Sequence, residues 1–103
     1  LDISRNKFVL FPQVISSISS LEILILNRNQ IEILPESIGD LSYLIEIDFW
    51  DNPIKNYPDA FISMNLKKVH AEGIRYNAKF QEKWKALMPK TQFFFDSPCD
   101  CMD

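Results

Sequence analysis

The chain has 103 residues and a mass of 12.1 kDa, enough for one domain. Its residues are 47% hydrophobic and 24% charged, as in an ordinary globular protein, and a net charge of −3 excludes the strongly basic stripe that nucleic acid binding requires. The charge is uneven, because residues 1–65 sum to −5, residues 66–90 to +5 and residues 91–103 to −3. We therefore expect an acidic and a basic region on the surface.

Apolar residues and asparagines recur along the chain at a step of 23 residues. A repeat of this length predicts a solenoid, in which each unit stacks on the next and buries one continuous core. The matched positions are Leu1, Leu24 and Ile47; Asn6, Asn29 and Asn52; Phe8, Ile31 and Ile54; Phe11-Pro12, Leu34-Pro35 and Tyr57-Pro58; and Ile15, Ile38 and Phe61.

Each repeat is expected to form a short strand, a turn and a looser return segment. In the second repeat the strand covers about residues 21–26, with its three leucines pointing inward. The side-chain amide of Asn29 is expected to bond the backbone of neighbouring turns, where no strand partner exists.

The fourth repeat, which starts at Leu66, is one residue shorter than the others. Gly73 and Ile74 replace its turn, and no asparagine follows. Such a departure is typical of the last unit of a solenoid. We therefore expect the repeats to cover residues 1–74.

Residues 75–95 are expected to form a C-terminal cap. A helix over about 78–88 begins after the N-cap residue Asn77 and ends before Pro89. Its apolar stripe consists of Phe80, Trp84, Leu87 and Met88. This stripe is expected to seal the open core of the last repeat. Alternatively, the basic helix docks against an acidic partner or a calmodulin-like groove.

Residues 91–95 are expected to be extended and to contain an apolar run, Phe93, Phe94 and Phe95. This run is expected to pack back over the cap, or else to contact a neighbouring subunit, because exposed apolar patches usually mark interfaces. Residues 96–103 form a short acidic tail.

Two features bear on the whole protein and on membranes. The first residue is not Met and lies inside a repeat, so we expect the chain to be the C-terminal part of a longer protein. No stretch approaches the roughly 20 apolar residues of a membrane-spanning helix, and no membrane span is expected.

The segment LEILILNRNQIEILPESIGDL, which begins at Leu21, closely resembles the 23-residue leucine-rich repeat that carries a Leu-Pro pair. That type occurs in cytosolic proteins, including Ras-signalling scaffolds, scribble-like polarity proteins and plant Ras-group proteins. The resemblance covers about residues 1–72 and implies a right-handed α/β solenoid with a parallel sheet on its concave face. It also implies protein binding without catalytic activity. Phe49-Trp50-Asp51 departs from the small or polar residues usual at these positions.

The resemblance also bears on the cell compartment. Extracellular proteins of this family usually carry disulfide-bonded caps, whereas the repeats here contain no cysteine and the chain has no N-x-S/T glycosylation site. We therefore expect an intracellular, cytoplasmic and reducing location.

Strand residues that alternate with the inward-facing leucines are expected to point outward, in columns about 4.8 Å apart. Three columns are expected: Ile23, Glu46 and Lys68; Asp2, Ile25, Asp48 and His70; and Ser4, Asn27, Trp50 and Glu72. Just after the strands come Arg5, Arg28 and Asp51. Glu46 is expected to pair with Lys68, and Asp48 with His70, which would stabilise neighbouring strands by a few tenths of a kcal/mol each.

Trp50 is the strongest candidate for contact with a partner, because Trp and Arg dominate the binding energy of protein interfaces. Alternatively, its ring lies flat on Ile25 or Ile45 and covers them. The predicted protein-binding residues are Arg5, Ile25, Asn27, Arg28, Asp48, Trp50, Asp51, His70 and Glu72.

Catalysis and cofactors find no support in the sequence. The single histidine, His70, has no cysteine or serine at a recognisable spacing, and no glycine-rich phosphate loop is present. Cys99 and Cys101 lie near Asp96 and Asp103, but a structural zinc site needs a second ligand pair, which is missing. The expected tail is reduced and free of metal, and Asp100 stands where a prenylated cysteine would be.

The sequence therefore predicts a non-catalytic scaffold or adaptor that binds proteins on the concave face. One alternative is a structural subunit of a cytoskeletal or ciliary assembly, contacted through the cap and tail. Another is a regulatory domain attached to a longer enzyme.

Overall fold

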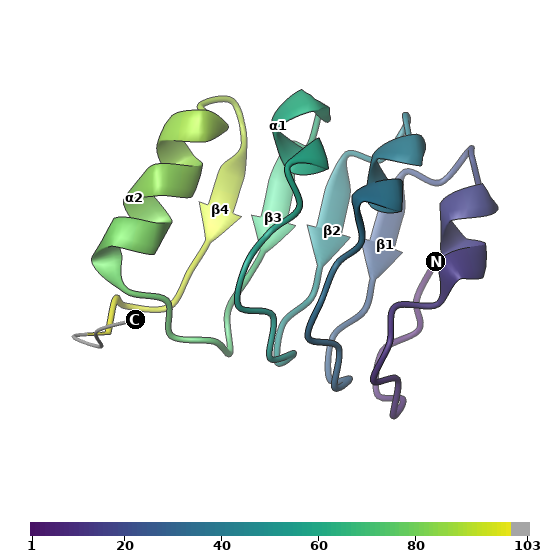
Figure 1. Ribbon diagram of the computed structural model, residues 1–103, viewed down its shortest axis with the longest axis horizontal. Helices are drawn as coiled ribbons and strands as arrows, with labels where there is room; N and C mark the ends of the chain where they lie inside the picture. Colours follow the sequence, from purple (N-terminus) through teal and green to yellow (C-terminus); the bar gives the residue numbers. More distant parts are fainter. Residues whose placement is uncertain (100–103) are drawn as a thin grey trace.

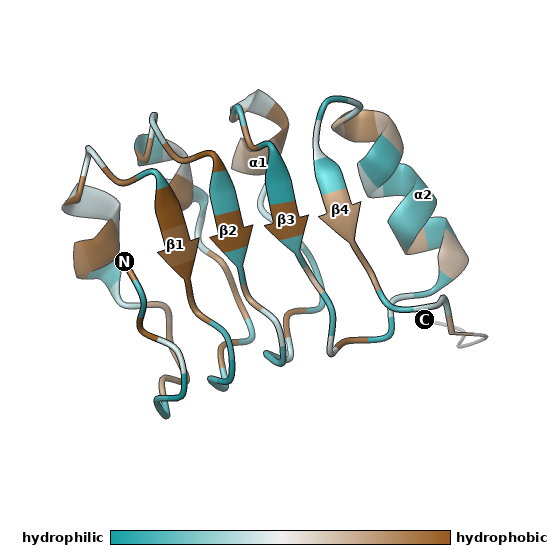
Figure 2. Cartoon of the chain, turned by 180° about the vertical axis from the view of Figure 1, so that it is seen from behind, coloured by the Kyte–Doolittle hydropathy of each residue, from teal (hydrophilic) through white to brown (hydrophobic). Residues whose placement is uncertain are grey.

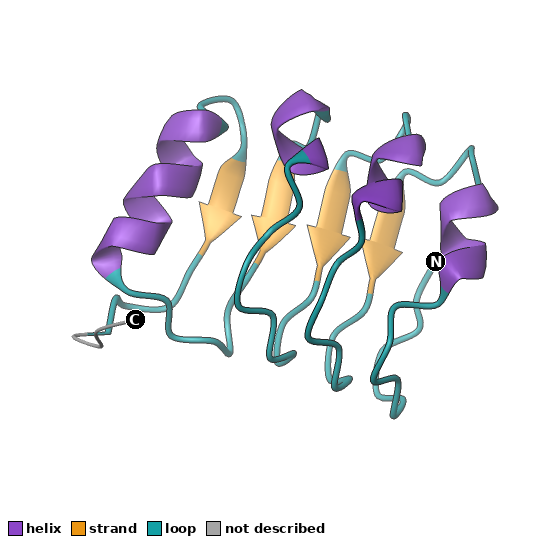
Figure 3. Ribbon diagram, viewed as in Figure 1, coloured by secondary structure: helices purple, strands orange, loops and turns teal. Residues whose placement is uncertain are grey.

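The computed structural model describes residues 1–99, which form a row of stacked repeats (Figure 1). Four parallel strands form one sheet in the order β1-β2-β3-β4, and helical segments cover its other side (Figure 3). This arrangement confirms the predicted α/β solenoid. The elements are η1 (Gln13–Ser17), β1 (Ile23–Ile25), η2 (Glu36–Asp40), β2 (Glu46–Asp48), α1 (Ala60–Ser63), β3 (Lys68–His70), α2 (Ala78–Leu87) and β4 (Gln92–Phe94).

Pairing between repeats extends beyond the three-residue strands. Past the end of β1, the Leu26 N–H donates to the Asp48 carbonyl at 2.7 Å and the Arg28 N–H donates to the Trp50 carbonyl at 2.9 Å. The first repeat joins the sheet through a bridge between Asp2 and Ile25. The predicted strand over residues 21–26 is therefore longer than β1 itself, although the backbone pairing continues beyond it.

The core lies between the sheet and the helical segments, where the repeated apolar positions meet. Leu24, Ile47 and Val69 face each other in register and are fully buried. Complete burial of one such side chain stabilises the fold by about 1.5–3 kcal/mol. In the first repeat, Phe8 stays 38% exposed, because only one side of that repeat is covered.

A ladder of buried asparagines ties each turn to the one before it. The Asn52 side-chain oxygen accepts from the Ile31 N–H at 3.1 Å, and its amide nitrogen donates to the carbonyls of Leu26 (3.0 Å) and Phe49 (3.1 Å). Asn29 makes the matching bonds one repeat earlier. These bonds satisfy backbone groups that have no strand partner.

One residue in the turn of each of the four repeats adopts a left-handed backbone conformation. The positions and their φ angles are Arg5 (57°), Arg28 (58°), Asp51 (59°) and Gly73 (87°). Only the last is a glycine, and a Cβ there would lie 2.7 Å from the Asp51 nitrogen. The Gly73 N–H donates to the Asp96 carboxylate at 2.8 Å. The terminal repeat therefore needs a glycine because the preceding turn approaches it closely.

Helix α2 covers the last repeat. The Asn77 side chain caps it by accepting from the Phe80 N–H at 2.8 Å. Trp84 and Met88 are buried, but Leu87 is 40% exposed. The sequence placed Leu87 in the buried stripe, and this placement is wrong because the helix ends there and Met88 turns into the core instead. A polar residue, Gln81, occupies the other buried position of the helix.

The segment expected to pack back over the cap is the fourth strand of the sheet. Strand β4 pairs in parallel with β3. Because side chains alternate along a strand, Phe93 and Phe95 lie on one side, stacked on each other with ring centroids 5.0 Å apart, and Phe94 lies on the other. The three phenylalanines therefore do not form a single apolar patch for a neighbouring subunit.

Candidate protein-binding face

The side of the sheet turned away from the helical segments, which we call the sheet face, carries the candidate residues. Figure 2 views this side, with apolar β1 at one end and the more polar β2 and β3 beside it. The strand register aligns the outward residues in two rows, Ile23, Glu46, Lys68 and Gln92, and Ile25, Asp48, His70 and Phe94. Asp2 extends the second row through its bridge to Ile25.

On this face the His70 ring contacts two neighbouring side chains. Its Nε2 lies 2.8 Å from the Glu46 carboxylate, and its ring stacks on Phe94 with centroids 4.6 Å apart and planes 4° apart. The predicted pairing of Asp48 with His70 is wrong. Within residues 1–99, Glu46 pairs with His70 rather than with Lys68.

The Asp48 carboxylate accepts one hydrogen bond from its own repeat and one from the preceding repeat. It accepts from the Asn27 amide at 3.0 Å and from the Trp50 N–H at 3.0 Å. Both of its oxygens therefore have partners, and His70 turns instead to Glu46. The structure thus brings Asn27, Asp48 and Trp50 together at the end of the strands.

Trp50 and Arg28 form the second fixed pair. The Arg28 guanidinium carbon lies 4.7 Å from the centroid of the half-buried Trp50 ring. Such a cation–π contact contributes about 0.5–1 kcal/mol where solvent has access. Arg28 and Asp51 both follow a strand in the left-handed conformation, as does Arg5 one repeat earlier. Glu72 is half-buried after β3, at the position that corresponds to Trp50.

Two residues of the sheet face, Gln92 and Phe94, were not predicted from the sequence. They are exposed and half-buried, respectively, and β4 adds them as the fourth member of each row. Gln92, the partner of Lys68, lies 24 residues after it, and this near-repeat of the period is a weak signal for another strand. The missing turn asparagine after β3 masked that signal.

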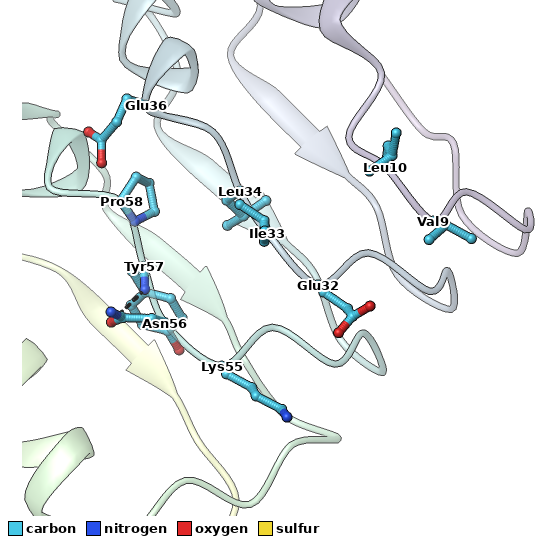
Figure 4. A pocket seen from close by; sticks show the side chains of 10 residues that line it. All are labelled: Val9, Leu10, Glu32, Ile33, Leu34, Glu36, Lys55, Asn56, Tyr57 and Pro58. Atoms are coloured by element: carbon cyan, nitrogen blue, oxygen red, sulfur yellow. Dashed lines mark hydrogen bonds between the residues drawn. The ribbon is translucent and has the colours of Figure 1, made fainter.

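On the opposite side, the return segments border a groove of about 490 Å³ (Figure 4). Leu10 is 79% exposed there and Ile33 is 73% exposed. The remaining residues around it are Val9, Glu32, Leu34, Glu36, Lys55, Asn56, Tyr57 and Pro58. The Glu36 carboxylate is occupied, because its two oxygens accept from the backbone N–H groups of Asp59 and Ala60, each at 2.9 Å.

Neither a group of metal ligands nor a membrane-spanning helix is found in the described part of the chain. Among residues 1–99, no three His, Cys, Asp or Glu side chains are placed to hold a metal ion, and no helix is long and apolar enough to cross a bilayer. Cys99 is disulfide-bonded, so the reduced thiol expected there is wrong. Cys101 and Asp103, the other members of the predicted tail cluster, lie outside the described residues.

Comparison with known proteins agrees with the repeat geometry. The family model described as Leucine Rich Repeat matches residues 20–41. Among solved structures, the chain is similar to a leucine-rich repeat protein of Leptospira interrogans, with 28% identity and a TM-score of 0.81 over 89% of this chain and 24% of that one. The chain thus spans about a quarter of that protein's length. No curated protein sequence matches. Stacked parallel strands, the asparagine ladder and both similarities lead to one conclusion: the chain contains a leucine-rich repeat and has the leucine-rich repeat solenoid fold.

Proposed function

We propose that the chain is a non-catalytic scaffold or adaptor that binds a protein partner on its sheet face. The observation that carries this proposal is that the outward side chains are already held by their neighbours. Trp50 lies under Arg28, and His70 lies between Glu46 and Phe94. Binding to a prearranged surface loses little side-chain entropy, and more of the contact energy therefore contributes to affinity.

The chemistry of the sheet face favours a partner with cationic groups. Asp2, Glu46, Asp48, Asp51 and Glu72 supply carboxylates, whereas Arg5, Arg28 and Lys68 supply the cations. Trp50 supplies the aromatic area on which interfaces commonly concentrate their energy. We therefore place the centre of the interface at Trp50 and Arg28.

Affinity capture from the protein's own cells, followed by quantitative mass spectrometry, tests this function. The variant carries Arg28→Gln and Trp50→Ala. A matched control carries Lys7→Gln and Tyr43→Ala, which also removes one cation and one exposed aromatic ring. We expect the first variant to lose its main partner at least about tenfold, because truncated interface anchors typically cost 2 kcal/mol or more.

The control variant should retain that partner, and both variants should unfold at the wild-type urea concentration within a few tenths of a molar. Retention by both variants would contradict the proposal. Equal loss in both would show that the capture does not depend on the sheet face.

The alternative roles stay predictions. A structural subunit of a cytoskeletal or ciliary assembly, held through the cap and tail, would keep its partner in the Arg28 and Trp50 variant. The regulatory-domain alternative predicts that a catalytic domain lies elsewhere in the same protein. The cytoplasmic location and the cytosolic repeat subtype also stay predictions.

A further inference from the structure

A second surface, at the start of the cap helix, has a chemistry unlike the sheet face. An open pocket of about 350 Å³ lies between the return segment of the third repeat and the first turns of α2. Its lining residues are Lys55, Asn56, Asn77, Lys79, Phe80 and Lys83. Three of these six carry a positive charge and none carries a negative one.

The two asparagines of this pocket have amide donors available for a ligand. The Asn56 oxygen accepts from the Tyr57 N–H at 2.9 Å (Figure 4), and the Asn77 oxygen accepts from the Phe80 N–H at 2.8 Å. Because a backbone N–H fixes each oxygen, the assignment of oxygen and nitrogen in these amides is determined. Both amide nitrogens remain available as donors.

The three lysines lack a carboxylate partner in the part of the chain that the structure describes. No ion pair joins Lys55, Lys79 or Lys83 to an acidic side chain within residues 1–99. The Lys83 ammonium lies 5.5 Å from the centroid of the Trp84 ring, which does not neutralise its charge. The pocket therefore presents ammonium and amide donors without a compensating anion.

The repeat provides an internal comparison for this pocket. One repeat earlier, Glu32 and Ile33 stand at the positions of Lys55 and Asn56, and two repeats earlier Val9 and Leu10 stand there. The same face of the solenoid is thus apolar and acidic along its first repeats, whereas five of the six residues that line the pocket at its C-terminal end carry a hydrogen-bond donor. Part of this change comes from the side chains at positions 55 and 56, and part comes from helix α2, which contributes Lys79 and Lys83 where the first two repeats have short 3-10 helices.

We propose that this pocket docks an acidic, carboxylate-rich peptide segment of a protein partner. Three ammonium groups and two amides match successive Asp or Glu side chains better than a single small anion, since they come from two separated chain segments. This site is independent of the sheet face, which displays mainly carboxylates. The protein would then hold two partners, or two parts of one partner, of opposite charge.

Fluorescence anisotropy with a fluorescein-labelled octaglutamate peptide tests the proposal, with labelled octaglutamine as the neutral control. We expect the wild-type protein to bind octaglutamate and not octaglutamine, and binding to weaken between about 50 and 300 mM salt as screening increases. Replacement of Lys55, Lys79 and Lys83 by Gln should weaken binding at least about tenfold. Replacement of Lys7, Lys67 and Lys90 by Gln removes the same charge outside the pocket and should leave binding within about twofold.

The variant Asn77→Asp separates binding from folding. Aspartate is as good an N-cap as asparagine, so α2 should remain folded, as judged by circular dichroism. The substitution replaces the outward amide donor with a carboxylate oxygen, and we expect it to weaken octaglutamate binding several-fold. The Arg28→Gln and Trp50→Ala variant should bind octaglutamate normally.

Four results would overturn the proposal. The first is no binding of octaglutamate by wild-type protein at about 50 mM salt. The second is an equal loss in the two triple variants, which would reflect only net charge. The third is displacement by inorganic phosphate at the same molar concentration as by unlabelled octaglutamate, which would indicate a small-anion site. The fourth is tighter, pocket-dependent binding to phosphatidylserine vesicles, which would indicate a membrane surface.

Discussion

At the scale of the residue, two asparagines and one glycine determine how each turn meets the next. Asn29 and Asn52 are buried polar side chains whose hydrogen bonds go almost entirely to backbone groups of two adjacent repeats. Gly73 lies where the turn of the third repeat comes closest to that of the fourth. Each of these residues stabilises a contact between repeats rather than one within a repeat.

The substitution Asn52→Ala should lower the free energy of unfolding by about 2–4 kcal/mol, because it leaves the Ile31 N–H and the Phe49 carbonyl buried without their partner and removes one of the two amide donors to the Leu26 carbonyl. The matched change Asn6→Ala removes the same amide from an exposed turn and should cost less than about 1 kcal/mol. Urea unfolding measures both values. Equal losses would show that the ladder bonds contribute no more than exposed ones.

The substitution Gly73→Ala should destabilise the protein by about 2–4 kcal/mol, because the added Cβ meets the Asp51 backbone and the φ angle of 87° suits glycine. Gly73→Asn distinguishes the two causes. Asparagine tolerates a left-handed backbone but brings the same Cβ. We expect it to be as unstable as the alanine variant, and a return to wild-type stability would show that the close approach is unimportant.

At the scale of the element, the cap holds to the repeats through polar contacts that the apolar pattern did not reveal. The Gln81 amide donates to the carbonyls of Tyr76 (3.1 Å) and Asp96 (3.0 Å). The Tyr76 hydroxyl donates to the Ile54 carbonyl, and the Thr91 hydroxyl to the Leu66 carbonyl at 2.6 Å. The cap thus replaces the asparagine that the fourth repeat lacks with several side chains from different elements.

The substitution Gln81→Leu should lower the free energy of unfolding by about 1–3 kcal/mol, because the part-buried Asp96 carbonyl loses its amide donor and the Tyr76 carbonyl keeps only the Cys99 N–H. Glu82→Leu, on the exposed side of the same helix, should change it by no more than about 0.5 kcal/mol. Thermal and urea unfolding provide the measurement. A neutral result for Gln81→Leu would mean that water replaces the lost donor.

At the scale of the whole molecule, Tyr57 connects the repeats to the cap. Its ring lies within 6.4 Å, centroid to centroid, of six other aromatic rings. These come from the third repeat, the segment before α2, α2 and β4: Phe49, Phe61, Tyr76, Phe80, Trp84 and Phe93. Its hydroxyl is buried near the Tyr76 hydroxyl and, within residues 1–99, makes no hydrogen bond of regular geometry. Burial raises the pKa of the Tyr57 hydroxyl far above its ordinary value.

This burial predicts a loss of stability in alkali. In the unfolded chain a tyrosine releases its proton near pH 10, whereas the folded state keeps Tyr57 and Tyr76 protonated, because burial also raises the pKa of Tyr76. Stability is therefore fully present below pH 10 and falls above it by up to about 1.4 kcal/mol per pH unit for each group. Urea unfolding from pH 8 to 11 measures the slope.

The substitution Tyr57→Phe isolates one of these two groups. It should be neutral or stabilising by up to about 1 kcal/mol at pH 7, since an unpaired buried hydroxyl is removed. It should also reduce the alkaline slope by the contribution of one tyrosine. An unchanged slope would show that Tyr57 ionises in the folded protein.

The sequence predicted the regular part of this fold and failed where the period breaks. A step of 23 residues places Leu24, Ile47 and Asn52 without ambiguity, because each position has equivalents in other repeats. Strand β4 has no such equivalent, since a helix and not a return segment precedes it. Its role as a fourth strand depends on pairing with β3, which no local pattern of residues 91–95 reveals.

The candidate site was predictable in its backbone positions and not in its side-chain pairs. Alternation along the strands was enough to place Ile25, Asp48 and His70 in one row. The partner of His70 was not predictable, because a carboxylate one row away, Glu46, competes with the one directly opposite. Rotamers and neighbouring donors, such as the Asn27 amide that occupies Asp48, decide between them.

The left-handed turn and the turn asparagine recur every 23 residues through the first three repeats. Successive units there meet through the same backbone and side-chain contacts. A tandem duplication of residues 24–46 would therefore insert one more unit and keep every contact between repeats. The cap would still pack against the same last repeat. The row of outward side chains would lengthen by one strand. Gene duplication can therefore lengthen the binding surface by one strand for each 23-residue unit. A duplication of any other length would misplace the turn asparagines, and selection for folding would eliminate it.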